Sequence, residues 1–63
     1  MSHHRLSPSL KGDYHLLIGP YDLLLVEWIR TEIPDHARQW DPTVRAWRIQ
    51  NDYVDKVQAR INK

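Results

Sequence analysis

The 63-residue chain contains no cysteine, so neither disulfide bonds nor thiolate metal ligands contribute to its stability. A domain of this length buries only about 60% of the surface that its unfolded chain exposes, which leaves it a small core. Three tryptophans and three tyrosines supply the large apolar area that such a core needs. The sequence therefore predicts one small domain held by packing alone, and the lack of cysteine favours a cytoplasmic location.

The chain is expected to divide into an N-terminal lead-in and one domain. Residues 1–12 have no apolar periodicity, and we expect them to be a flexible lead-in. Residues 13–63 are expected to form a single α+β domain. No apolar run approaches the ~20 residues that a membrane-spanning helix needs, so we expect no membrane association.

Turn-forming residues separate five expected elements. These are a strand over Tyr14–Ile18, a helix over Pro20–Ile33, strands over Ala37–Trp40 and Arg45–Ile49, and a helix over Asn51–Ile61. Gly19-Pro20 ends the first strand, and Pro34 ends the first helix because the residue before a proline disfavours helical geometry. The expected fold is a compact β-α-β-β-α domain with a three-stranded sheet packed against two helices.

The hairpin between the last two strands is expected to face the first helix. Alternation places Trp40 and Trp47 on one side of it, and the helix presents an apolar stripe that includes Leu25 and Ile29. We therefore expect both tryptophans to be core residues. Asp41 begins a sequence typical of a type I turn, and its carboxylate is expected to accept a backbone hydrogen bond within that turn.

No catalytic or metal-binding pattern is present in the sequence. The histidines stand at positions 3, 4, 15 and 36, and no two of them have the spacing of a zinc site on a helix. No serine or threonine lies near a histidine and an acid in an arrangement typical of a nucleophile. With two glycines in the chain, there is also no glycine-rich phosphate-binding loop. We therefore expect no enzyme activity, no cofactor and no metal.

The basic residues are concentrated in the second half of the chain. The net charge is only +1, but six of the nine Lys and Arg residues follow position 36. Guanidinium groups suit bidentate contact with phosphate, so this clustering favours binding to nucleic acid. The candidate DNA-binding residues are Arg38, Arg45, Arg48, Lys56 and Arg60.

The stretch from Ile33 to Ile49 resembles a known pattern. Ile33-Pro34, then Arg38-x-Trp40-Asp41-Pro42, then Arg45-x-Trp47-Arg48-Ile49 resembles the IPGRRWDPxxKxWRVP signature. That signature marks the HARP-like (HepA-related protein) accessory domains of SNF2-type annealing helicases. The same module is similar to the N-terminal domain of the phage UvsW helicase and to small free-standing phage proteins. The resemblance covers roughly residues 14–61.

The resemblance implies a non-enzymatic accessory domain that binds single-stranded or branched DNA weakly and takes part in replication or recombination. Arg38, Arg45 and Arg48 match its basic positions. The sequence departs from the signature in the loop Asp35-His36-Ala37, which is longer and carries an acid, and at Gln39, which replaces a basic residue. No helicase motor is present, so a helicase or another recombination protein is an expected partner.

A protein-interaction module is the alternative. In that interpretation a surface on the first helix docks on a replication, recombination or transcription protein. The candidate contact residues are Leu23, Leu24 and Trp28. Homodimerisation through the same surface is a further alternative, because a small core often benefits from association.

Overall fold

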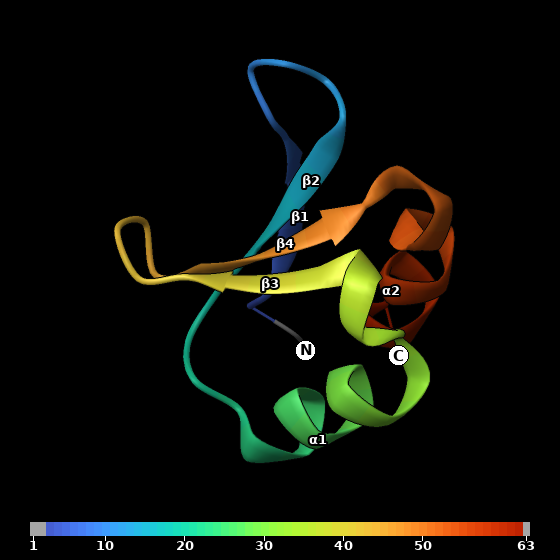
Figure 1. Cartoon of the computed structure of the whole chain (residues 1–63). Coiled ribbons are helices and arrows are strands. Elements are labelled where there is room, and N and C mark those ends of the chain that lie inside the picture. Colours follow the sequence, from blue (N-terminus) through green and yellow to red (C-terminus); the bar gives the residue numbers. More distant parts are fainter. Residues whose placement is uncertain (1–2, 63) are drawn as a thin grey trace.

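Two helices pack on one face of a four-stranded sheet in the computed structural model, which describes residues 3–62 (Figure 1). The strands are β1 (Arg5–Pro8), β2 (Tyr14–Ile18), β3 (Arg38–Asp41) and β4 (Ala46–Gln50). The helices are α1 (Leu23–Glu32) and α2 (Val54–Ile61). Two short 3-10 helices, η1 (Asp35–Ala37) and η2 (Asn51–Tyr53), precede β3 and α2. The expected α+β class with two helices is confirmed.

The sheet has four strands in the order β1-β2-β4-β3, and every neighbouring pair is antiparallel. The expected number of three strands is wrong, because Arg5–Pro8, within the segment expected to be a lead-in, pairs with β2. Leu6 lies opposite Leu17 and packs against the core. A four-residue strand that ends in proline and has one large apolar residue shows no alternating pattern, which is why the sequence did not indicate it.

Helix α1 begins three residues later than expected. The Asp22 carboxylate accepts hydrogen bonds from the backbone N–H groups of Leu24 at 3.0 Å and Leu25 at 3.3 Å. Asp22 is therefore the N-cap and lies outside the helix, because its side chain satisfies donors that have no partner within the first turn. Pro20 and Tyr21 consequently belong to the connection from β2.

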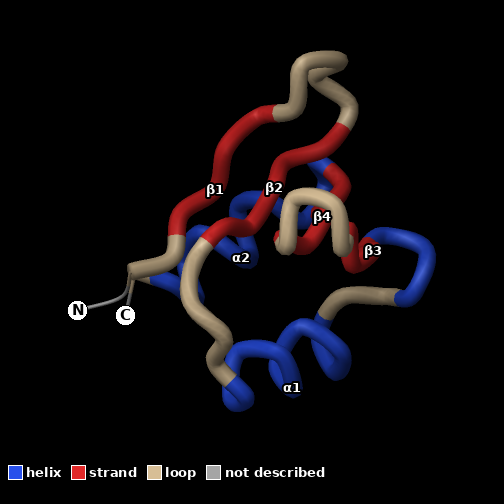
Figure 2. The backbone as a smooth tube through the Cα atoms, turned by 90° about the vertical axis from the view of Figure 1, so that its left-hand side faces the viewer, coloured by secondary structure: helices blue, strands red, loops and turns tan. Residues whose placement is uncertain are grey.

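The tightest packing lies between the sheet and both helices. Ile29 of α1 and Ile33, the C-cap of that helix, are buried completely together with Ile49 of β4 and Val57 of α2. The β2–β4 register places Leu17 opposite Trp47 and therefore on the same face as Ile49. Figure 2 shows this arrangement from the side of the β3–β4 turn, with α1 beneath the strands and α2 behind them.

The segment before α2 is a 3-10 turn and not the first turn of an α-helix. The helix was expected to begin at Asn51, but the side chain of Asn51 donates to the carbonyl of Gly12 at 2.7 Å and lies 2.9 Å from Nδ1 of His15. These contacts join the segment after β4 to the β1–β2 loop and to β2. Across residues 3–62, no helix has the length and apolar character needed to cross a membrane.

Candidate binding site

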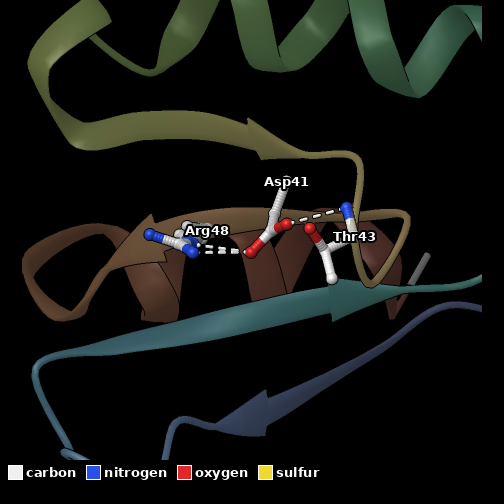
Figure 3. A network of polar contacts seen from close by, with 3 residues as sticks. All are labelled: Asp41, Thr43 and Arg48. Carbon is white, nitrogen blue, oxygen red and sulfur yellow. Dashed lines mark hydrogen bonds and ion pairs between the residues drawn. The ribbon is translucent and has the colours of Figure 1, made fainter.

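Arg48 is held in a network on the face of the sheet opposite the helices (Figure 3). Its guanidinium donates from Nε at 3.0 Å and from a terminal nitrogen at 2.6 Å to one carboxylate oxygen of Asp41. It also lies over the ring of Tyr14, 5.2 Å from the ring centroid. Arg48 therefore braces β4 against the start of the hairpin turn and against β2.

The expected role of Asp41 in the turn is confirmed. Its second oxygen accepts a hydrogen bond from the backbone N–H of Thr43 at 2.9 Å. The hydrogen bond from Arg48, followed by the bond from Thr43, lowers the pKa of Asp41 from its ordinary value, although partial burial opposes the shift. The same hydrogen bond with Asp41 raises the pKa of Arg48. The pair stabilises the charged forms of both groups.

Arg38 and Lys56 bind carbonyl groups at the end of α1. Nε of Arg38 donates to the carbonyl of Ile33 at 3.0 Å, and its guanidinium lies 3.5 Å from the Asp35 carboxylate. Nζ of Lys56 lies 3.3 Å from both the carbonyl and the carboxylate of Glu32. Cations in these positions satisfy the last carbonyls of a helix and complement its dipole. Both residues thus have a structural function in joining α1 to β3 and α2.

Arg60 is also engaged within the fold. Its guanidinium lies over the ring of Trp28, 5.9 Å from the centroid. Trp28 in turn packs against the buried cluster and is only partly exposed. Of the three residues expected at a protein interface, Trp28 is therefore the one that the fold already covers.

Arg45 differs from the other four candidate cations. It is exposed, and its side chain makes no hydrogen bond or ion pair with any of residues 3–62. Its backbone has a φ of +53°, in the left-handed region that non-glycine residues seldom adopt. The five predicted residues do not lie on one surface: Arg48 is on the open face of the sheet, Arg38 and Lys56 are at the end of α1, and Arg45 is in the hairpin turn.

A hollow of about 360 Å³ separates the first half of α1 from the β3–β4 hairpin. We call it the hairpin groove. Its lining includes Leu17, Tyr21, Leu25, Trp40, Arg45 and Trp47. Leu17 and Leu25 are buried, whereas Tyr21 is 80% exposed and Trp40 is 46% exposed. The groove thus has an apolar floor with aromatic rings and one guanidinium at its rim.

The expectation that Trp40 is a core residue is wrong. The rings of Trp40 and Trp47 form an edge-to-face pair with centroids 5.6 Å apart, but only Trp47 packs against the buried cluster. Trp47 is half-buried, so its expected place in the core is confirmed in part. Trp40 lies on β3, an edge strand of the sheet, and borders the hollow between α1 and the hairpin, so its ring is partly in solvent.

One end of the groove is closed by His4, which precedes β1. Nε2 of His4 lies 2.8 Å from the carbonyl of Pro20. The ring packs so closely on Gly19 that a Cβ there would lie 2.6 Å from His4 Cδ2. Glycine is therefore required at this position, and the contact fixes the connection that carries Tyr21 to the rim.

Further apolar side chains are exposed beside the groove. Leu23 and Leu24 at the start of α1 are 54% and 69% exposed, and Val44 in the hairpin turn is 52% exposed. Leu24 lies within the first turn of α1, and its exposure leaves it available as the alternative interpretation expected. Within residues 3–62, no three metal-ligating side chains cluster together.

Sequence reasoning missed Tyr21 and the exposure of Trp40. The available signal was Asp22, an N-cap residue immediately before Leu23-Leu24-Leu25, which predicts a later helix start and an uncovered Tyr21. No comparable signal predicts the left-handed backbone of Arg45, because arginine has no preference for that region.

Comparison with known proteins finds no match to this chain: no family model, curated protein or solved structure is significantly similar to it. The resemblance to HARP-like domains therefore rests on the residues of the Ile33–Ile49 stretch alone.

Proposed function

We propose that this chain is a non-enzymatic accessory module that binds single-stranded or branched DNA through the end of its β3–β4 hairpin. The observation that carries the proposal is Arg45. It is the one candidate cation whose side chain has no partner among residues 3–62, and it lies in the lining of the same groove as the exposed ring of Trp40. A cation beside an exposed aromatic ring is the combination with which proteins bind unpaired strands.

The backbone of Arg45 supports the same function. A left-handed conformation costs a non-glycine residue about 1–2 kcal/mol, and glycine or asparagine would adopt it more readily. The arginine side chain makes no hydrogen bond or ion pair with the described part of the fold that would offset this conformational cost. The left-handed position closes the β3–β4 turn, and asparagine would serve that turn better than arginine, so the turn does not explain the presence of arginine.

The other candidate cations contribute less than the sequence suggested, since Arg38, Arg48, Lys56 and Arg60 already have partners within the fold. A footprint of one or two phosphates is therefore expected. Each phosphate contact on a single strand contributes about −0.7 to the salt slope, so the slope should be roughly −1 and the affinity in the micromolar range at low salt.

The test is a titration with labelled oligothymidine, duplex and forked DNA at two salt concentrations, followed by fluorescence anisotropy. Arg45→Asn removes the charge and suits the left-handed backbone, so its effect is not confounded by unfolding. We expect it to weaken binding at least fivefold. Lys11→Ala is the matched control, because it removes one charge from the β1–β2 loop, away from the hairpin turn (Figure 1). The absence of binding to every form of DNA at low salt would reject the proposal.

A protein-interaction function is the second candidate, and the exposure of Leu23 and Leu24 favours it. Adjacent exposed leucines on a helix are suited to docking on another protein. The partner would be a replication, recombination or transcription protein, and a second copy of the chain is the simplest case to test. Analytical ultracentrifugation distinguishes that case: a dimer that Leu24→Glu dissociates supports it, and a monomer at all concentrations rejects it.

A further inference from the structure

The hairpin groove is a feature that simple phosphate binding does not require. Its floor consists of apolar side chains from β2, α1 and β4, represented by Leu17, Leu25 and Trp47. Its volume of about 360 Å³ falls within the range of sites that enclose small organic groups. The proposal that follows rests on the DNA-binding function proposed above and concerns what enters this groove.

The fold itself leaves the groove open. Capping by Asp22 starts α1 at Leu23 and leaves Tyr21 exposed on the rim, and Leu24 in the first turn of α1 is also exposed. Apolar walls without partner atoms lose dispersion contacts that an occupant would restore. A flat occupant gains most here, because Trp40 and Tyr21 offer exposed aromatic surface at the rim.

The charges around the groove indicate the orientation of the occupant. Arg45 lines it with an unpartnered guanidinium, whereas one oxygen of Asp22 is occupied by the backbone of α1 and its negative charge disfavours an anion at that end. The occupant therefore combines an apolar, planar group with an anion on the Arg45 side. A nucleotide of a single strand has this construction, since its base and its phosphate are joined through one sugar.

We propose that the hairpin groove accepts one unpaired nucleobase, which stacks on Trp40 while Arg45 binds the adjacent phosphate. Stacking tolerates every base, so the site reads the absence of pairing and not the sequence. Duplex DNA presents its bases already stacked and paired, and a base must leave the helix before it can enter a groove. The module therefore prefers single strands and frayed junctions to intact duplex.

The experiment compares oligothymidine with a strand of equal length in which every base is absent and the sugar–phosphate chain is intact. Removal of the bases should weaken binding about tenfold, as loss of one stacking contact does. Trp40→Ala should abolish the difference between the two strands, whereas Arg45→Asn should weaken both by the same factor. Val44→Ala, which trims an exposed apolar residue of the same turn, is the matched control and should preserve the difference.

Thermal melting of each variant verifies that it is folded, and Tyr21→Ala tests the rim from the other side if Trp40→Ala unfolds. Equal binding of the two strands by the wild type overturns the nucleobase site and leaves the DNA-binding function standing. Failure of both strands to bind overturns the DNA-binding function itself. Equal binding of duplex and single strand, with the abasic strand still tenfold weaker, contradicts the preference for unpaired DNA.

Discussion

The two halves of helix α1 face the sheet in different ways. At its C-terminal end, Ile29 and Ile33 are buried completely against Ile49 and Val57, and Lys56 binds the last turn from α2. At its N-terminal end, Leu25 is buried but borders a groove whose opposite wall, Trp40, is half in solvent. One helix thus closes the core at one end and borders an open groove at the other.

The difference separates residues that stabilise the fold from residues that are available to a ligand. Most candidate cations lie in or near the closed half or on the braced open face of the sheet, where each has a partner. The hairpin half contains the cation without one. A cluster of basic residues in a sequence therefore indicates how many cations are present, but their contacts within the fold determine which of them are available to a ligand.

Ile49→Ala tests the closed half and should have the largest effect. Ile49 of β4 is fully buried in the cluster that the sheet forms with the helices, and truncation of a buried isoleucine costs about 4 kcal/mol through lost burial and the cavity that remains. Chemical denaturation should show a loss close to the whole stability of so small a domain. A loss below about 1 kcal/mol would mean that the closed half is not the core.

Substitution of each of the two tryptophans compares the closed half of the molecule with the hairpin half. Trp47→Ala should cost about 3 kcal/mol because its ring packs against the core, whereas Trp40→Ala should cost about 1 kcal/mol, which is the worth of an edge-to-face pair. Denaturation midpoints of the two variants under identical conditions provide the measurement. Equal losses would show that Trp40 is as much a core residue as Trp47.

Asp41→Asn tests the Asp41–Arg48 pair through the pH dependence of stability. The folded state holds the pKa of Asp41 below its ordinary value, so the carboxylate stabilises the fold above about pH 4 and loses this effect as the pH falls through the folded pKa. Between pH 6 and pH 2, the free energy of unfolding should therefore fall further for the wild type than for Asp41→Asn. The difference corresponds to the protonation of one carboxylate. Thermal melts at each pH measure this.

Asp52→Asn is the control for that comparison, because Asp52 is exposed and forms no ion pair within residues 3–62. Parallel pH profiles for the wild type and Asp41→Asn would contradict the assigned role of the Asp41–Arg48 pair.

Arg45→Asn should have the smallest effect on stability, with the opposite sign. Asparagine tolerates the left-handed backbone, so the free energy of unfolding should rise by up to about 1 kcal/mol. DNA binding should weaken in the same variant. A gain in stability together with a loss of binding is the signature of a residue kept for function, and a destabilised variant would assign Arg45 a structural role.

Much of the framework could be predicted from the sequence. The strand Tyr14–Ile18 is observed with the expected bounds, and the hairpin turn with its Asp41 hydrogen bond follows from the chemistry of Asp-Pro. The second helix is shorter than expected because Asn51 binds the β1–β2 loop, a contact between segments far apart in sequence. Strand β1 was missed for a related reason, since pairing with β2 defines it more than its own residues do.

The candidate site could be predicted only in part. The sequence identified Arg45 as a candidate cation and Trp40 as an aromatic residue of the hairpin. The groove that both residues line depends on where α1 starts and on how α1 and the hairpin pack. The engagement of Arg38 depends on the turn of η1, which brings its guanidinium back to the carbonyl of Ile33. Local patterns predict elements, whereas the partners of a long side chain depend on packing between elements.

The most direct test of the proposed DNA-binding site is a nuclear magnetic resonance titration of the labelled protein with oligothymidine at low salt. We expect the largest chemical-shift changes at the Trp40 indole N–H, at Arg45 and at Tyr21, all of which line the hairpin groove. Changes centred on Arg38, Lys56 and Arg60, with Trp40 unaffected, would contradict it and assign DNA binding to the closed half of the molecule.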